Sequence, residues 1–239
     1  MGWRRGLLLL AFGAALVLGA GLAGRHYLAG RRLVLRPDGG PVVSVMDFAK
    51  PLPLDPLPPG WEHRKFWMRR AMTMSHAVKD GVAAMRFATA NSASMLVRHV
   101  DIALADYPIL AWRWYVERPI DSALDERTPE GDDHPVRLLL RFTGQHGHRP
   151  AMEIIWSNRL KPGQFIYIGS FPHYIADGGA PHVGQWRDER IDLAHLYAEL
   201  WPGAGPAYLA EIAVFCNSDD THQATVSYVA YVRLERDRG

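Results

Sequence analysis

The chain has 239 residues, of which 48% are hydrophobic and 22% are charged, and its formal net charge is +2. This composition excludes an intrinsically disordered chain, and the length suits one domain with appendages. The small net charge, together with the absence of a zinc-finger spacing and of a long basic run, gives no support for nucleic acid, and we expect no such partner.

The N-terminus carries an uncharged, apolar run over residues 6–24, which follows Arg4 and Arg5. Its length lies between that of a signal-peptide core and that of a transmembrane helix. We therefore expect residues 1–30 to be a signal peptide or a signal anchor that associates with the membrane as a hydrophobic helix. Four arginines follow the run and outnumber the two before it. A count of flanking positive charges would therefore place the C-terminal side in the cytoplasm, whereas the segment itself has the features of an export signal. We expect export, and hence a periplasmic protein or one anchored in the inner membrane and facing the periplasm.

Residues 31–60 form a proline-rich segment that we interpret as an extended connector or a wrapping arm. Proline fixes φ and removes a hydrogen-bond donor, so regular structure is disfavoured there. Within this segment, residues 42–48 could form a short edge strand.

From residue 61 onward, hydrophobic residues alternate with a period of two, which predicts a β-sandwich domain over residues 61–239. Three segments show this best, at 108–117, 134–142 and 225–234. The residues expected to face the core are Leu110, Trp112, Trp114 and Val116 in the first, Val136, Leu138, Leu140 and Phe142 in the second, and Val226, Tyr228, Ala230, Val232 and Leu234 in the third.

Only one later segment, residues 192–201, is typical of a helix. Asp192 is a credible N-cap, and Pro202 and Gly203 end the run. Further strands are expected at 81–89, 151–158, 164–170 and 210–216 from their β-branched and aromatic content, and Cys216 is expected in the core. No strand–helix–strand rhythm is present, so we expect an all-β sandwich with one short helix rather than a parallel α/β fold.

Several motifs share a characteristic order along the chain. They are WRW at 112–114, GDD at 131–133 with Arg137 four residues on, IIWSNRL at 154–160, GQWRDERIDL at 184–193 and NSDDTHQATVSYVAYVRL at 217–234. From about Asp47 to Leu234 this order resembles the uncharacterised bacterial family known as domain of unknown function 3047. The family pattern near the end runs roughly Asp-x-Asp-Asn-Thr, whereas this chain has Asn217 at the first position. The resemblance implies a jelly roll similar to galactose-binding-like carbohydrate modules, and it implies no established activity.

Strand phase places several cationic side chains away from the core. Arg137 and Arg141 oppose the inward residues of their strand, and Arg113 and Tyr115 do so in theirs. If the two strands share a sheet, three guanidiniums and a phenol line one surface, which would suit an acidic glycan. The alternative is that Asp132 or Asp133 pairs with an arginine and fixes a turn. The candidate ligand contacts are Arg113, Asp132, Asp133, Arg137, Asn158 and Trp186.

A second polar stretch, residues 217–221, offers hard oxygen ligands at close spacing. Asp219 and Asp220 are candidate ligands for calcium, together with Asn217 and Thr221. The alternative is an Asx-type turn before the last strand. We expect no other cofactor.

These observations favour a non-catalytic module that binds a glycan or another anionic ligand of the envelope. A first alternative is an envelope hydrolase that uses Asp132 or Asp133 as acid or base, partnered by Asp219, Asp220 or Glu153. A second alternative is a scaffold that binds another protein through a face of the sandwich.

Overall fold

The structure is a computed structural model that describes residues 33–237. The expected signal peptide or anchor lies outside the described residues. The described residues from Leu35 onward form one compact unit. Within the described part of the chain, no helix is long and apolar enough to cross a bilayer.

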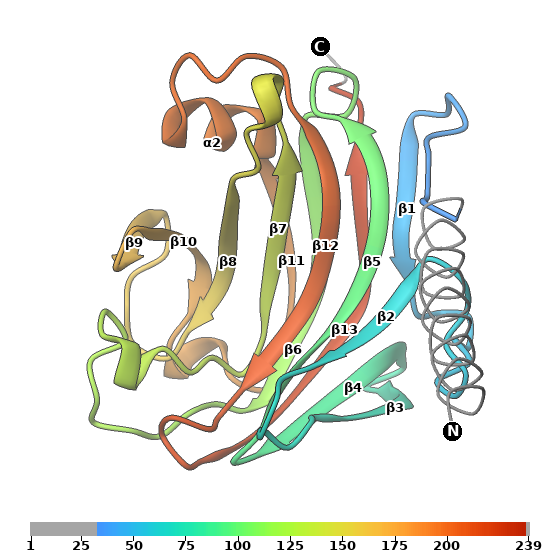
Figure 1. Cartoon of the computed structure of the whole chain (residues 1–239). Helices are drawn as coiled ribbons and strands as arrows, with labels where there is room; N and C mark the ends of the chain where they lie inside the picture. The colour runs from blue at the N-terminus through green and yellow to red at the C-terminus, as the bar shows by residue number, and fades with distance from the viewer. Residues whose placement is uncertain (1–32, 238–239) are drawn as a thin grey trace, which may run out of the picture. The chain divides into compact units, whose positions relative to one another are not determined.

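The unit is a jelly-roll β-sandwich of two sheets, as the alternating pattern predicts (Figure 1). One sheet has six strands in the order β11-β6-β13-β4-β3, with β1 also paired to β13. Its strands are β1 (Val42–Asp47), β3 (Thr73–Lys79), β4 (Val82–Ala90), β6 (Ile109–Arg118), β11 (Trp186–Asp192) and β13 (Ala224–Glu235).

The other sheet has seven strands in the order β2-β5-β12-β7-β8-β10-β9. All its neighbouring pairs are antiparallel except β8 and β10, which run parallel. Its strands are β2 (Trp61–Lys65), β5 (Ala93–Ala103), β7 (Arg137–Thr143), β8 (Ala151–Ser157), β9 (Gln164–Ile168), β10 (Phe171–Gly178) and β12 (Tyr208–Asn217).

The main core fills the space between the two sheets and confirms the expected strand phases of β6 and β7. The eight residues predicted to point inward from these strands are all buried in it, and Cys216 joins them. Burial raises the pKa of the Cys216 thiol to about 12, so it is protonated at neutral pH. Because side chains alternate along a strand, Arg137, Leu139 and Arg141 lie on the outer face of the seven-stranded sheet.

The predicted phase of β13 is wrong in its first half. Val229, Val232 and Leu234 enter the main core, whereas Tyr228 and Ala230 lie in a separate cluster on the outer face. A β-bulge explains the change. Val229 pairs with Trp114 and Tyr231 with Arg113, so one extra residue of β13 interrupts the register with β6 and reverses the faces.

The proline-rich segment packs against the sandwich from residue 35 onward. β1 pairs with β13, and Phe48, which follows β1, is buried in the main core. Leu35 forms an isolated parallel bridge with Val100 of β5. The segment therefore behaves as the wrapping arm of the two forms considered, and it supplies a strand to the six-stranded sheet.

The short helix α2 (Leu193–Leu200) is present at the expected position. Asp192 caps it, because its side chain accepts a hydrogen bond of 2.8 Å from the backbone N–H of His195. Leu193, Leu196 and Tyr197 are buried on its inner side. The helix thus closes the main core at one end of the sandwich (Figure 1).

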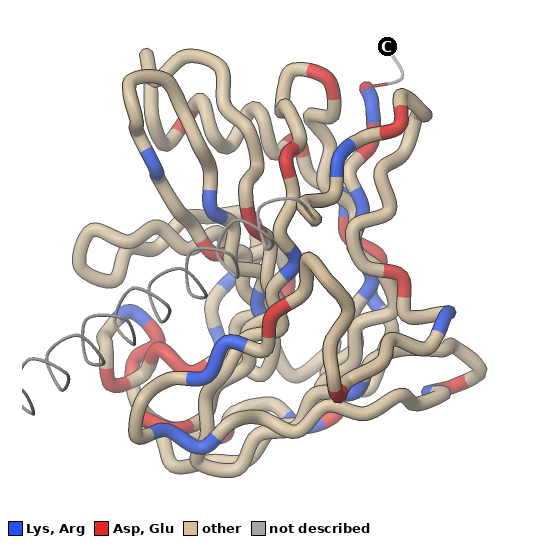
Figure 2. Tube along the Cα trace, turned by 45° about the vertical axis from the view of Figure 1, so that its right-hand side comes forward, with Lys and Arg blue, Asp and Glu red and all other residues tan. Residues whose placement is uncertain are grey.

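Charged residues of both signs are interspersed along the trace (Figure 2).

Candidate functional site

Arg137 is the centre of a polar cluster at the start of β7. Its side chain is fully buried, and its guanidinium lies over the ring of Phe215 at 4.1 Å from the centroid. Nη1 donates to Asp132 at 2.8 Å and to Glu153 at 2.7 Å. Nη2 donates to the side-chain carbonyl of Asn217 at 2.6 Å and to the backbone carbonyl of Asp132 at 3.0 Å. Burial disfavours the charge, but Asp132 and Glu153 outweigh it and raise the pKa of Arg137.

Asp132 keeps part of its side chain exposed, and its charge is stabilised by three neighbours. Besides Arg137, its Oδ1 lies 3.3 Å from Nε2 of His134 and 3.6 Å from Nε2 of His173. Burial raises the pKa of Asp132, but the guanidinium of Arg137 and the two imidazoles outweigh it and hold the pKa well below its ordinary value. Asp132 is therefore an ionised acceptor of hydrogen bonds at neutral pH.

Asp133 is hydrogen-bonded to Thr221 rather than to Arg137, and it is completely buried, with 0% of its surface exposed. Its Oδ2 accepts hydrogen bonds of 2.7 Å from both the backbone N–H and the hydroxyl of Thr221. Its Oδ1 accepts from the amide of Asn217. The side chain thus holds the loop before β7 to the loop after β12 through neutral donors, whereas the aspartate–arginine pair considered for the GDD motif is made by Asp132 with Arg137.

Asn158 lies close to this loop, but its side chain forms hydrogen bonds with backbone groups. Its Oδ1 accepts from the N–H of Ile120 at 2.9 Å, and its Nδ2 donates to the carbonyl of Asp133 at 3.2 Å. The amide thereby connects three segments of loop.

Arg113 and Trp186 belong to the other sheet, which corrects the expectation of one shared arginine surface. Strand β6 carries Arg113 in the six-stranded sheet and β7 carries Arg137 in the seven-stranded sheet, so these side chains lie on opposite outer faces. The alternation within each strand was predicted correctly, but which strands share a sheet is a long-range property. Arg113 lies over the ring of Trp186 at 5.3 Å, and Trp186 Nε1 donates to the carbonyl of Lys79 at 3.1 Å. Trp186 is therefore half-buried and held in place.

The exposed aromatic ring that sequence reasoning missed is Trp67. It lies between β2 and β3 with 89% of its surface exposed. The sequence gives one signal, because the apolar run Phe66-Trp67-Met68 is short, does not alternate as a strand would and is flanked by Lys65 and Arg69. It lines a surface depression of about 340 Å³ on the seven-stranded sheet, whose other lining residues include Phe66, Arg69, Asp132, Arg137, Glu153, Phe171, His173, Asp219 and Asp220.

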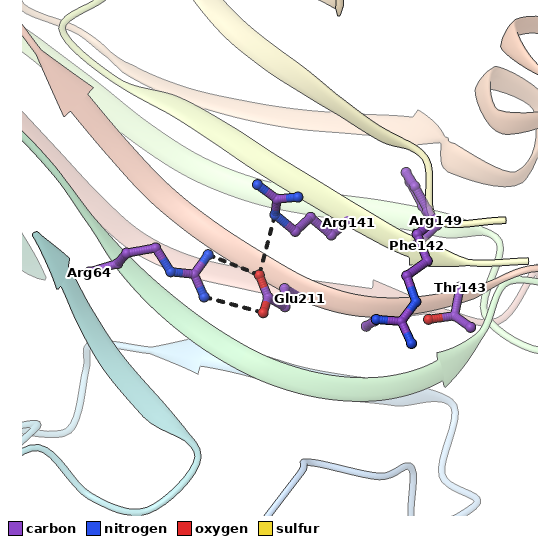
Figure 3. Close-up of a pocket in the computed structure, with 7 residues that line it drawn as sticks. Arg64, Arg141, Phe142, Thr143, Arg149 and Glu211 are labelled. Carbon is purple, nitrogen blue, oxygen red and sulfur yellow. Dashed lines mark hydrogen bonds and ion pairs between the residues drawn. The ribbon is translucent and has the colours of Figure 1, made fainter. Parts of the chain in front are cut away.

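A second depression, of about 300 Å³, lies on the same sheet and is rich in arginine (Figure 3). Glu211 of β12 accepts two hydrogen bonds from Arg64 of β2, at 3.0 and 3.2 Å, and lies 3.5 Å from Nε of Arg141. Arg149 lines the same depression, and no ion pair to it is found within residues 33–237. The remaining N–H groups of Arg141 and Arg149 are thus free to bind an anion.

Asp219 and Asp220 follow β12 and border the depression that holds Trp67. Nη1 of Arg69 lies 3.1 Å from Oδ2 of Asp219, and Nη2 lies 3.7 Å from Oδ1 of Asp220. Burial, followed by the charges of Asp219 and Asp133, raises the pKa of Asp220. The carboxylates therefore lie close enough to repel one another.

Residues 59–233 match the model of a family described as a protein of unknown function, DUF3047. The chain belongs to this family. No curated protein sequence matches it significantly.

Three solved structures are similar to this chain at low sequence identity. The family 30 carbohydrate-binding module of a cellulosomal cellulase of Clostridium thermocellum is 7% identical, with 83% of this chain and 99% of that chain covered and a TM-score of 0.47. The mannan-recognising module TmCBM27 is 14% identical, with 83% and 99% covered and a TM-score of 0.33. A family 12 xyloglucanase from Bacillus licheniformis is 8% identical, with 82% and 100% covered and a TM-score of 0.41.

Proposed function

We propose that this DUF3047 protein is a non-catalytic module that binds a glycan on the outer face of its seven-stranded sheet. The observation that carries the proposal is Trp67, a large apolar ring left 89% exposed at the border of a polar depression. Leaving an indole in water forgoes about 2–3 kcal/mol of burial free energy. An exposed ring beside hydrogen-bonding groups offers the apolar plate on which a sugar stacks its C–H face.

The depression supplies the polar partners that such a ligand needs. Asp132 is ionised and partly exposed, so it can accept hydrogen bonds from sugar hydroxyls. Arg69 is half-exposed and can donate them. Arg137 is already paired with Glu153 and also donates to Asp132, so it holds Asp132 in position.

The arginine-rich depression favours a ligand that carries negative charge. Arg137 and Arg141 are four residues apart on β7, which corresponds to about 13 Å along a strand. A glycan of a few sugars that stacks on Trp67 could therefore place an acidic group near Arg141 and Arg149. Guanidinium groups bind carboxylate, sulfate and phosphate through paired hydrogen bonds. We accordingly propose an acidic glycan of the cell envelope, which agrees with the periplasmic location expected from the N-terminal segment.

The hydrolase alternative receives less support from the same geometry. A glycosidase needs one carboxyl group that stays protonated near neutral pH. The pKa of Asp132 is lowered, and Asp133 is fully buried behind it. Asp132 also accepts a hydrogen bond from Arg137, which favours its ionised form.

The test is glycan binding by the full chain, solubilised in mild detergent and applied to an array of acidic and neutral bacterial glycans. Trp67→Ala should weaken binding to any bound glycan at least tenfold and leave the melting temperature unchanged, because the ring is exposed. Trp186→Ala is the matched control, and it should lower the melting temperature but retain binding. Arg141→Ala should weaken acidic glycans only. The proposal fails if the folded protein binds no glycan, or if Trp67→Ala binds as tightly as the wild type.

A further inference from the structure

Three carboxylates from two loops come together beside the Trp67 depression. Asp133 precedes β7, and Asp219 and Asp220 follow β12. One oxygen from each of the three lies within 4.8 Å of the others. The loops are far apart in sequence, so only the folded sandwich creates this group.

No cation pairs with the buried carboxylate of Asp133 among the described residues. Its hydrogen-bond partners are the neutral side chain of Asn217 and the N–H and hydroxyl of Thr221. Neutral donors stabilise a carboxylate, but they leave its full negative charge in place. The charge therefore acts on Asp219 and Asp220, each of which has a carboxylate oxygen within 4.8 Å of one of Asp133.

Asp219 is more than nine-tenths buried, with 6% of its surface exposed, and it is only partly compensated. Its Oδ2 faces Arg69, a side chain that is half in solvent and whose attraction water therefore screens. Its Oδ1 is buried and has no hydrogen-bond partner in the described part of the chain. The hydroxyl of the preceding residue, Ser218, is likewise buried without a partner. Buried polar atoms are normally satisfied, so an unsatisfied carboxylate oxygen indicates a missing ligand.

We propose that Asp133, Asp219 and Asp220 bind a calcium ion. Calcium takes six to eight oxygen ligands in flexible geometry, and carboxylates, backbone carbonyls and water all serve. The ion would neutralise the buried charges of Asp133 and Asp219, of which only Asp219 now has a cation beside it, the half-exposed Arg69. It would also link the loop that carries Asp132 to the loop that borders the depression. This inference concerns the metal alone and does not depend on the glycan proposal.

The site differs from the one expected from residues 217–221 alone. Asn217 and Thr221 direct their side-chain donors to Asp133, so they support a ligand rather than act as one. Asp133, which comes from a distant loop, replaces them.

A second group of metal-ligand residues lies nearby but holds an internal cation. Oxygen and nitrogen atoms of Asp132, Glu153 and His173 also lie within 4.8 Å of one another. Nη1 of Arg137 donates to both carboxylates, so its charge already occupies the position that a metal would take. The calcium proposal therefore concerns the Asp219 group only.

The test is calorimetric titration of the chelator-treated full chain with calcium chloride, compared with magnesium chloride, and with melting temperatures measured in parallel. We expect calcium to bind and to raise the melting temperature. Asp220→Asn should weaken calcium binding at least tenfold, and Asp219→Asn should abolish it. Asp188→Asn removes an exposed carboxylate of the other sheet and is the matched control, which should bind like the wild type.

Arg69→Ala gives an independent test, because Arg69 would compete with the ion for the carboxylate oxygens of Asp219 and Asp220. This variant should bind calcium more tightly than the wild type, and calcium should restore its melting temperature. If Asp219→Asn does not fold, Arg69→Ala and Asp220→Asn still test the proposal. The proposal is overturned if about 10 mM calcium, well above the dissociation constants of extracellular modules, neither releases heat nor shifts the melting temperature. It is also overturned if Asp220→Asn binds calcium like the wild type.

Discussion

The side chains of Arg137 and Asn217 are joined by a hydrogen bond of 2.6 Å, in which the guanidinium donates to the amide carbonyl. The same amide donates from its Nδ2 to the carboxylate of Asp133 and to the backbone carbonyl of Asp132. Position 217 therefore needs a group that accepts on one side and donates on the other. An amide does both, whereas a carboxylate only accepts.

Asn217→Asp should consequently destabilise the fold. The substitution removes two donated hydrogen bonds and places a second negative charge beside Asp133. We expect a loss of about 1–3 kcal/mol in the free energy of unfolding, reduced somewhat by attraction to Arg137. Urea denaturation at pH 7 measures it. Asn91→Asp, at an exposed turn, is the control, and a loss equal to that of the control would contradict the prediction.

Removal of the buried guanidinium of Arg137 should lower the free energy of unfolding by more than Asn217→Asp does. Arg137→Met removes the guanidinium that bridges Asp132 and Glu153, and a broken buried ion pair typically costs about 3–5 kcal/mol. The pKa of Asp132 is depressed in the native state, so its stabilising contribution is present above its unfolded pKa and is lost as the pH falls. The difference between the variant and the wild type should therefore be fully present at pH 7 and narrow as the pH falls below about 3.8, the ordinary pKa of an aspartic acid side chain. Denaturation at pH 7 and at about pH 2 checks this, and a constant difference would argue against the ion-pair network.

Glu189 on β11 should make the protein less stable at alkaline pH. Burial, followed by the charge of Asp177 and a hydrogen bond to it, raises the pKa of Glu189 to about 7 from an ordinary value of 4.5. A raised pKa of an acid means that the native state holds the proton more tightly than the unfolded state. The stabilisation is therefore complete below about pH 4.5 and is lost as the pH rises through 7.

Because Glu189 is only half-buried, we expect an effect of about 1–2 kcal/mol after allowance for screening. Glu189→Gln should abolish this part of the pH dependence and be more stable than the wild type at pH 8. Unfolding free energies between pH 5 and pH 8 test the prediction. A variant that follows the wild-type profile at every pH would refute it.

Gly131→Ala should disturb the loop that carries the site. A Cβ atom at this position would lie 2.2 Å from the backbone carbonyl oxygen of Asp125, so one backbone segment must move. The adjacent Glu126 accepts hydrogen bonds from Ser157 and from the backbone of Asn158, and these would be strained. We expect a loss of about 1–3 kcal/mol, which thermal unfolding would show as a lower melting temperature. An unchanged melting temperature would mean that the loop tolerates displacement.

Much of the fold could be predicted from local pattern. Alternation placed the inward residues of β6 and β7 correctly, and Asp192 correctly predicted the start of α2. These features depend on neighbours two to four residues away, which the sequence displays directly. The phase of β13 could not be predicted, because its bulge is fixed by register with β6 across the sheet.

The sequence by itself determined that a sandwich with alternating faces would form and that Arg137 would lie outside the main core. Only the tertiary structure decided which side chains contact Arg137. Sheet assignment separated Arg113 from Arg137, and loop closure brought Asn217 to Arg137 and Asp133 to Asp219. The physical reason is that strand faces follow from backbone periodicity, whereas contacts between loops depend on which strands pair and on how tightly the whole sandwich packs.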